Sequence, residues 1–312
     1  MSFNMRTREL SIGAGVLNFV ILYAIAILLF VVPEKIGPYQ RGFYCDDESI
    51  RFETKPNTVL IKDLFIATFL LSFLIIFLCE LFLYFNHDSN AQTHYKWFNF
   101  RMPSFLVQTG KFYGYYHAGF VMVVVLTQIP KYIVGRMRPH FMDVCRPTPG
   151  YVCMNPHEYV TNYTCIEPTD YKHAHYLLEA RMSFFSGHAA ASLYFAVVIS
   201  LYLQSRLAAR DIYWGHLQKF QISLVIIAIL ISYTRIMDNF HHPSDVVVGL
   251  VCGAIMGYLT VKHAMGLFIY KDGHIAVKNP EGMKTFANFV AEFGILFPEF
   301  CFLKIITGSK DD

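Results

Sequence analysis

Six segments of the chain are rich enough in apolar residues to be read as membrane spans. They run from Leu10 to Pro33, Leu64 to Phe85, Phe112 to Pro130, about Ser186 to Leu203, Phe220 to Thr234, and about Val246 to Val261. A helix needs about 20 apolar residues to cross a bilayer. Several segments fall short of that length because Lys131, Arg235 or Asp245 stands at one end. The pattern predicts an all-α integral membrane protein with six transmembrane helices.

Composition supports one membrane domain with two short ends. The chain is 54% apolar and 16% aromatic, which excludes disorder, and its net charge of +3 without a basic stripe excludes nucleic acid as a partner. The first apolar run is longer than the core of a signal peptide, about 7 to 15 residues, so it is expected to be an uncleaved anchor. We expect an N-terminus over 1–9, a six-span domain over 10–265 and a tail over 266–312.

Cations and histidines concentrate in three stretches at the edges of the apolar segments: Lys131–Pro139, Ser186–His188 and Arg235–Asp245. Ionisable groups in or against a bilayer are costly and usually mark a functional site. With six spans, the first stretch follows span three, the second opens span four, and the third joins spans five and six. All three therefore lie at one membrane face, and the active site is predicted at the ends of spans three to six.

The loop between spans three and four suggests which face this is. It contains a sequon at Asn162, and glycosylation occurs on the luminal or extracellular side. Cys145, Cys153 and Cys165 surround the sequon, and together with Cys45 they would form disulfides in an oxidising compartment. Their pairing cannot be read from the sequence. We expect an extracellular or luminal active site and cytosolic termini. The expected location is the plasma membrane.

The three stretches have the chemistry of a phosphate pocket. Arginine forks match phosphate oxygens and lysine adds a point charge, so Lys131, Arg138 and Arg235 suit an anionic ligand. Ser186 and Gly187 begin span four, where free backbone N–H groups and the helix dipole favour an anion. Gly187 would also let the ligand approach the backbone. We predict a site for a tetrahedral oxyanion.

Two histidines and one carboxylate could carry out the reaction. Pro243 suits the first turn of span six, which puts His241 just before that helix and Asp245 within its first turn. Asp245 would accept a hydrogen bond from His241 and leave the other ring nitrogen as a nucleophile. His188 would protonate the leaving oxygen. The expected reaction is in-line attack on phosphorus, a phosphohistidine intermediate, and hydrolysis by water.

Other interpretations of these residues remain. A single cation at a span end is usually an interfacial anchor, and Arg136 and His242 beside the motifs are interpreted as ordinary polar groups. The two histidines and the aspartate could instead bind a metal ion. The three surrounding cations would repel a divalent ion, so we expect no metal and no cofactor.

The motifs K-x6-RP, SGH and R-x5-H-x3-D resemble the type-2 phosphatidic acid phosphatase superfamily, in particular the animal lipid phosphate phosphatases, also called phospholipid phosphatases. The resemblance covers most of residues 10–265. It includes the segments Tyr39–Cys45, Asp47–Ile50, Arg138–Phe141 and Ser183–His188. Two departures are mild: Phe185 replaces a proline and Thr234 replaces a serine.

The resemblance implies metal-independent hydrolysis of lipid phosphomonoesters on the exoplasmic leaflet, with phosphatidate, lysophosphatidate, sphingosine 1-phosphate and ceramide 1-phosphate as typical substrates. It implies His241 as nucleophile, His188 as acid and base, and Asp245 as a partner. The implied phosphate ligands are Lys131, Arg138, Ser186, Gly187 and Arg235.

Two alternative functions stay open. One is a related phosphatase or phosphotransferase acting on a soluble phosphate or diphosphate. The aromatic-rich spans favour a lipid substrate over a soluble one. The other is an inactive membrane scaffold of the same fold, which would be expected to lack the two histidines. The preferred lipid, the membrane compartment and assembly into a homo-oligomer cannot be read from the sequence.

Overall fold

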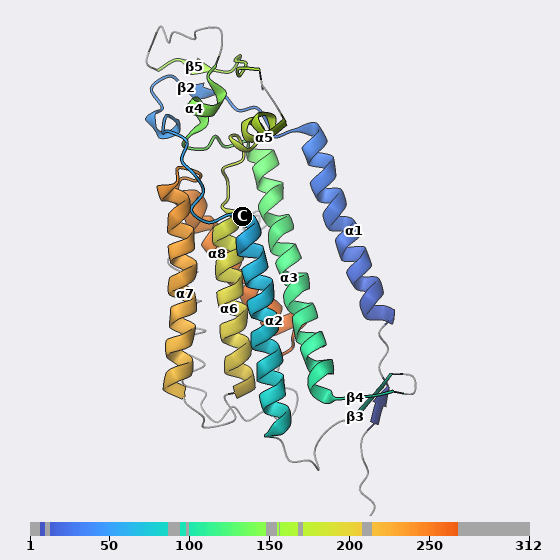
Figure 1. Ribbon diagram of the computed structural model, residues 1–312. Coiled ribbons are helices and arrows are strands. Elements are labelled where there is room, and N and C mark those ends of the chain that lie inside the picture. Colours follow the sequence, from blue (N-terminus) through green and yellow to red (C-terminus); the bar gives the residue numbers. More distant parts are fainter. Residues whose placement is uncertain are drawn as a thin grey trace, which may run out of the picture.

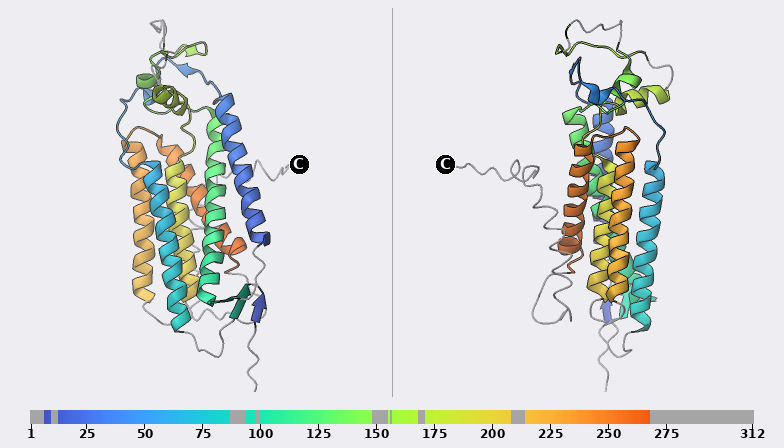
Figure 2. Two further views of the ribbon diagram at one scale, coloured as in Figure 1. Left: turned by 45° about the vertical axis from the view of Figure 1, so that its right-hand side comes forward. Right: turned by 90° about the vertical axis from the view of Figure 1, so that its left-hand side faces the viewer.

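A computed structural model describes residues 7–9, 13–86, 94–97, 100–147, 155, 157–167, 171–207 and 214–267, and its main body is a bundle of long helices (Figure 1). The long helices are α1 (Gly13–Ile36), α2 (Ile61–Phe85), α3 (Ser104–Val134), α6 (Gly187–Leu207), α7 (Trp214–Met237) and α8 (Pro243–Leu259), which continues as a π-helical turn, Thr260–Ala264. Helix α6 lies at the centre and packs against α2, α3, α7 and α8. Helix α1 lies along α3 at the edge of the bundle (Figures 1 and 2).

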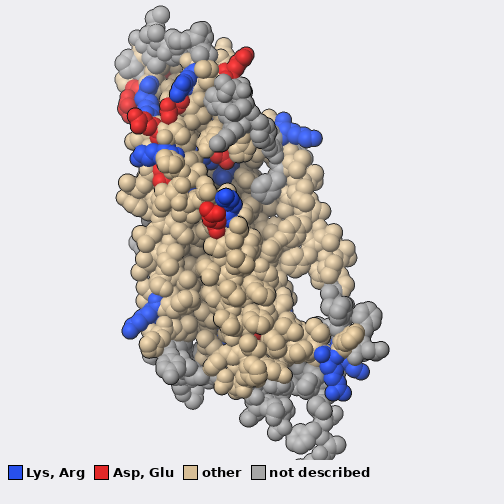
Figure 3. Space-filling view, in the orientation of Figure 1, with Lys and Arg blue, Asp and Glu red and all other residues tan. Residues whose placement is uncertain are grey.

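Five of these helices, all except α1, are long and apolar enough to cross a membrane. The chain is therefore an integral membrane protein. Helix α1 has 24 residues, of which Gly15–Leu29 form a shorter apolar stretch. Charged side chains gather toward the two ends of the bundle and leave an uncharged band between them (Figure 3).

The third and fifth predicted spans ended too early. Helix α3 continues through Pro130 to Val134, and α7 continues to Met237, so Lys131 and Arg235 lie within the last turns of their helices. Counting charges ends a segment at its first cation. A lysine or arginine can nevertheless stay helical when its side chain turns inward, toward a polar cavity rather than toward lipid.

Small residues hold α6 against α8. A Cβ atom added to Gly249 would lie 2.5 Å from the carbonyl oxygen of Ser186, and one added to Gly253 would lie 2.3 Å from that of Ala190. Such close backbone approach between membrane helices requires glycine. The packing fixes the start of α8 beside the start of α6, which are the two helix ends that carry predicted catalytic residues.

A buried ion pair fixes the opposite end of α6. Arg206 donates two hydrogen bonds, of 2.8 and 2.7 Å, to the carboxylate of Glu80 on α2, and the hydroxyl of Tyr202 donates a third, of 2.7 Å. A charge-assisted, bidentate pair of this kind gives a fixed geometry as well as stability. It ties α2 to α6 far from the predicted site.

A small cap covers one end of the bundle (Figures 1 and 2). It contains η1 (Glu48–Ile50), α4 (Phe141–Cys145), α5 (Tyr171–Glu179) and a two-stranded antiparallel sheet of β2 (Phe43–Tyr44) and β5 (Tyr159–Val160). A second small sheet, with the order β1 (Thr7–Glu9), β3 (His94–Trp97) and β4 (Phe100–Met102), lies at the other end. The all-α prediction missed both sheets, because strands this short leave no alternation in the sequence.

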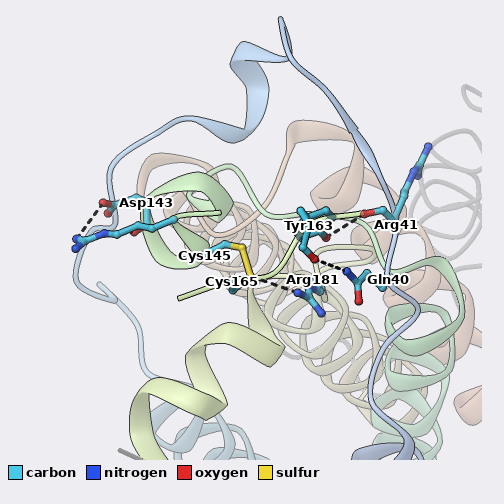
Figure 4. The surroundings of a disulfide bond; sticks show 8 residues. Gln40, Arg41, Asp143, Cys145, Tyr163, Cys165 and Arg181 are labelled. Carbon is cyan, nitrogen blue, oxygen red and sulfur yellow. Dashed lines mark hydrogen bonds and ion pairs between the residues drawn. A yellow bond between two sulfur atoms is a disulfide. The ribbon is translucent and has the colours of Figure 1, made fainter. Parts of the chain in front are cut away.

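A disulfide between Cys145 and Cys165 holds the cap together (Figure 4). The hydroxyl of Tyr163 donates to the carbonyl of Arg41, 3.1 Å away, and the amide of Gln40 donates to the carbonyl of Tyr163. The segment before β2 is thus joined to the segment after β5. Cys45 is disulfide-bonded as well. Cys153 and the predicted tail beyond residue 267 lie outside the described residues.

Candidate functional site

Residues from all three predicted stretches meet in one cavity of about 470 Å³ between the bundle and the cap. Six of the eight predicted site residues line it: Lys131, Arg138, Gly187, His188, Arg235 and His241. The other two, Ser186 and Asp245, are fully buried and lie behind the wall. Helices α2 and α3 contribute the apolar side chains of Phe65, Val123 and Val124, and also the polar ones of Lys62, Thr127 and Gln128.

One ring nitrogen of His241 is hydrogen-bonded to the backbone. Its Nδ1 lies 2.7 Å from the backbone carbonyl of Ser183, which can only accept a hydrogen bond. Nδ1 therefore carries the hydrogen, and Nε2 carries the lone pair. Burial lowers the pKa of His241 well below its usual value, and the nearby charges of Arg138 and Lys131 lower it further. The ring is neutral at pH 7, as a nucleophile requires.

The predicted hydrogen bond between Asp245 and His241 is not formed. Asp245 Oδ2 is 4.0 Å from His241 Nδ1 and instead accepts the hydroxyl of Ser183 at 2.6 Å and the backbone N–H of His242 at 3.1 Å. The other oxygen accepts Arg136 Nη1 at 2.6 Å. At the N3 position of α8, Asp245 completes a capping box, so its carboxylate points back along its own helix end. It reaches His241 through Ser183.

His188 is held by the segment that leads into α2. Residues 51–60, here called the strap, run without regular secondary structure from the cap to α2. The carbonyl of Val59 in the strap accepts a hydrogen bond from His188 Nε2 at 3.0 Å. Nδ1 is thus the nitrogen of His188 that remains for proton transfer.

The strap also anchors Arg235, which is 1% exposed. Arg235 donates to Asp238 at 2.5 Å and to the side chain of Asn57 in the strap at 2.8 Å. Asp238 in turn accepts the backbone N–H of Thr58 at 2.9 Å and its hydroxyl at 2.7 Å. The hydroxyl of Thr234 accepts Arg235 Nε at 3.1 Å, so the family's serine-to-threonine departure keeps a useful oxygen.

Phe240 lies between two of the cations. The guanidinium carbon of Arg138 is 5.3 Å from the centre of its ring, and that of Arg235 is 5.6 Å away. A cation over an aromatic face is attracted by the ring quadrupole. Arg138 also contacts Glu179 at 3.4 Å, and burial lowers the pKa of Arg138. The Phe240 ring thereby stabilises two arginines whose charges repel each other.

The start of α6 gives only part of the anion site that was predicted. The backbone N–H of Ser186 donates to the carbonyl of Asp245 at 3.0 Å, so it is not free. Its hydroxyl accepts the N–H of Ala189 at 3.4 Å and so acts as the helix N-cap. Gly187 does line the cavity, and a Cβ atom placed on it would be 3.8 Å from Lys131 Nζ. Among the described residues, Lys131 forms no ion pair.

A left-handed glycine carries the chain back over the site. Gly135 ends α3 with a φ of 57°, and a Cβ atom there would lie 2.0 Å from the carbonyl oxygen of Tyr39. Only glycine tolerates both the conformation and the contact. The turn directs Arg136 and Arg138, which follow Gly135, toward α8 and the cavity.

Five residues that support the site were not predicted to do so: Asn57, Arg136, Ser183, Asp238 and Phe240. Arg136 was interpreted as an ordinary polar group, although it forms the buried ion pair with Asp245. Asp238 had one usable signal, since it lies three residues after Arg235 in the same helical register. Ser183 also had a signal, because it opens the segment Ser183–His188 that resembles the family, whereas neither the residue type nor the spacing of Asn57 is distinctive.

Comparison with known proteins agrees with this geometry. The family model described as "PAP2 superfamily" matches residues 112–266, which include all eight predicted site residues. "Phospholipid phosphatase homolog 1.2 homolog" of Caenorhabditis elegans is 36% identical over 250 residues, covering 80% of this chain and 71% of that protein. Phospholipid phosphatase 2 of Homo sapiens is 30% identical over 270 residues, covering 84% and 88%.

A third relative, phospholipid phosphatase 1 of Mus musculus, is 32% identical over 270 residues, covering 83% of this chain and 88% of that protein. No solved structure matches the chain. With relatives of this identity aligned along most of their length, and with the family match spanning the cavity, the chain belongs to the PAP2 superfamily and, within it, to the animal lipid phosphate phosphatases.

Proposed function

We propose that this protein is a metal-independent lipid phosphatase that hydrolyses phosphomonoesters through a phosphohistidine. The observation that carries the proposal is the state of His241. Its Nδ1 donates to the carbonyl of Ser183, which leaves Nε2 of the neutral ring with a free lone pair in a cavity whose lining includes the three predicted phosphate-binding cations. The relatives' names, phospholipid phosphatase, support the same activity.

The first step is attack by His241 Nε2 on the phosphorus atom. A P–N bond forms and the ester P–O bond breaks in line with it. The leaving oxygen takes a proton from His188, which enters the step protonated once the dianionic phosphate is bound beside it. Lys131, Arg138 and Arg235 stabilise the charge on the equatorial oxygens, usually the largest contribution in such a site.

The second step releases phosphate. Neutral His188 removes a proton from water, the water oxygen bonds to phosphorus, and the P–N bond breaks to restore neutral His241. In this scheme Asp245 is a positioning residue. It holds the hydroxyl of Ser183, whose carbonyl holds the His241 ring, and its negative charge lies 4.0 Å from Nδ1.

A lipid fits the cavity better than a soluble phosphate does. Beside its cations, the cavity is lined by apolar side chains: Leu60 at the end of the strap, Ile61 and Phe65 on α2, and Val123 and Val124 on α3. Leu60 and Ile61 are 41% and 44% exposed on the outer surface of the bundle. Phosphatidate, lysophosphatidate, sphingosine 1-phosphate and ceramide 1-phosphate all combine a phosphomonoester with a chain that could stay in the bilayer.

The proposal includes an orientation. Helix α1 is taken as the sixth span, which puts both termini in the cytosol and the cavity on the exoplasmic side. Two features of the cap support this: the disulfide between Cys145 and Cys165, and the exposed sequon at Asn162. Disulfides persist in oxidising compartments. The plasma membrane is the compartment that we propose.

The test is release of phosphate from lysophosphatidate by the purified protein in excess chelator. We expect turnover without added metal, and we expect His241→Ala to abolish both turnover and an acid-labile phosphoenzyme. Strict dependence on Mg²⁺, or labelling that survives His241→Ala, would overturn the mechanism. Absence of turnover on every lipid phosphate would favour an inactive scaffold.

A further inference from the structure

A second cavity, also of about 470 Å³, lies beside the reaction cavity and is lined almost entirely by apolar atoms. We call it the α1 groove. One side is formed by Tyr23, Ala26, Ile27 and Val31 of α1, and the other by residues of α2 and α3, Phe65 and Val124 among them. Nothing in the proposed chemistry uses this space, so it calls for an occupant of its own.

The α1 groove adjoins the reaction cavity. Phe65 and Val124 line both cavities. On α3, Val124 lies seven residues before Lys131, which is about 10 Å along a helix that rises 1.5 Å per residue. The groove continues for another seven residues, to His117. A molecule with its phosphate at Lys131 would therefore find this apolar space about 10 Å deeper in the membrane.

The deep end of the groove is formed by Tyr23 and His117, which are hydrogen-bonded to each other. The hydroxyl of Tyr23 is hydrogen-bonded to His117 Nε2, which ties α1 to α3. The His117 ring stacks on Phe69 with centres 4.6 Å apart and planes 22° apart. The Tyr23 hydroxyl and His117 Nε2 satisfy each other, and the groove otherwise presents mostly ring faces and aliphatic side chains to an occupant.

We propose that the α1 groove holds the hydrocarbon chain of the lipid phosphate while its phosphate occupies the reaction cavity. This inference rests on the proposed function and adds a binding site for the chain. The two cavities lie in the same order as the two parts of the substrate: the charged cavity is next to the cap, and the apolar groove lies deeper in the membrane. A chain already dissolved in the bilayer gains little by moving into an equally apolar groove. The groove therefore acts by position, because a seated chain fixes the distance between the phosphorus atom and His241.

The test fills the groove from α1. Ile27→Trp puts a large ring into it, whereas Leu28→Trp puts the same ring on the neighbouring residue, which is 61% exposed and does not line the groove. Phosphate release is measured on oleoyl and hexanoyl lysophosphatidate in mixed micelles. We expect Ile27→Trp to lower kcat/KM on the oleoyl lipid about tenfold or more relative to the hexanoyl lipid, since small misplacements of a substrate slow the reaction strongly. Leu28→Trp should leave that ratio unchanged.

The outcomes are separable. An equal ratio in wild type, Ile27→Trp and Leu28→Trp would mean that another lipid or a neighbouring copy fills the groove, and would overturn the inference. Failure of the wild type to hydrolyse either lipid would overturn the proposed function instead.

A second experiment uses the wild-type protein and so avoids the risk that Ile27→Trp fails to fold. A lysophosphatidate with a diazirine near the chain end should label the segments around Tyr23 and His117, and labelling confined to α7 would again overturn the inference.

Discussion

At the scale of single residues, the site depends on side chains that never touch the cavity. His241 presents the correct nitrogen because a carbonyl of Ser183 holds the other one, and Ser183 stays in place because Asp245 accepts its hydroxyl. Asp245 in turn is charged and 0% exposed, which is tolerable only because Arg136 pairs with it at 2.6 Å. Each member of this chain of contacts can be tested separately.

Arg136→Gln should weaken both stability and turnover. It leaves the buried carboxylate of Asp245 without its cation, and loss of one partner of such a pair costs about 3 kcal/mol. Misplaced Asp245 would release Ser183 and His241, so kcat should fall while KM changes little. Thermal unfolding in detergent and steady-state kinetics would measure the two effects. Arg136→Lys keeps the charge and should recover part of the stability; an unchanged kcat in Arg136→Gln would contradict this role.

Phe240→Leu should weaken phosphate binding. The ring lies under the guanidinium groups of both Arg138 and Arg235, and each such contact is worth about 0.5 to 2 kcal/mol. Without the ring face the two arginines lose their shared support, and KM and the inhibition constant of vanadate should rise about tenfold. Phe240→Tyr keeps the ring face and serves as the control. If Leu and Tyr at this position behave alike, the ring face does not matter.

Stability should fall in acid. Burial, helped by the charge of Arg138, lowers the pKa of His140 from 6.5 to about 4. The unfolded chain therefore binds this proton more readily, so the loss begins as the pH drops below 6.5 and is complete near 4. His140 alone should lose about 2 kcal/mol of stability at pH 5.

Unfolding midpoints between pH 7 and pH 5 would measure this effect. His140→Asn can still donate to the carbonyl of Asn239, which lies 2.7 Å from His140 Nδ1, but it cannot take up a proton. Its midpoint should therefore depend less on pH than that of the wild type. Parallel curves would show that His140 contributes nothing to the acid sensitivity.

At the scale of elements, the strap decides how the helix ends are arranged. It reaches His188 through Val59, Arg235 through Asn57, and α4 through the backbone N–H of Thr54, which donates to Asp143 at 2.8 Å. No residue pattern indicates this role, because the strap is a polar segment between two spans and many of its contacts are made by its backbone. Motif spacing could predict which helix ends meet, but not the segment that holds them together.

Two aspartates bind the strap, and substituting each in turn separates its effect on phosphate binding from its effect on stability. Asp238→Asn weakens the contact with Thr58 and also the ion pair with Arg235, so KM should rise about tenfold, in keeping with a loss of about 1.4 kcal/mol. Asp143→Asn weakens the contact with Thr54 and an exposed ion pair with Arg146, both outside the cavity, and should lower thermal stability with little effect on KM. A similar KM in the two variants would contradict a role of Asp238 in phosphate binding.

At the scale of the whole molecule, the sequence predicted the helical membrane architecture and six of the residues that line the reaction cavity. Six of eight predicted site residues line it because helix parity and motif spacing are global constraints that one sequence already contains. Ser186 was predicted to bind phosphate and Asp245 to bind His241. Their side chains instead accept backbone N–H groups at the starts of α6 and α8, as an N-cap and in a capping box. The α1 groove could not be predicted, since it depends on how α1 leans against α3 rather than on any residue pattern.

The orientation of the whole molecule gives the last prediction. Asn162 is exposed in the same cap that contains the disulfide and covers the cavity, so an exoplasmic cavity requires that this sequon can be glycosylated. Protein made in animal cells should become smaller on treatment with an endoglycosidase, and Asn162→Gln should remove the shift. Asp88→Thr adds a sequon at Asn86, at the opposite end of α2, where no sugar should be added if that end lies in the cytosol, as proposed. Glycosylation there, in place of Asn162, would reverse the orientation and place the phosphatase site on the cytosolic leaflet.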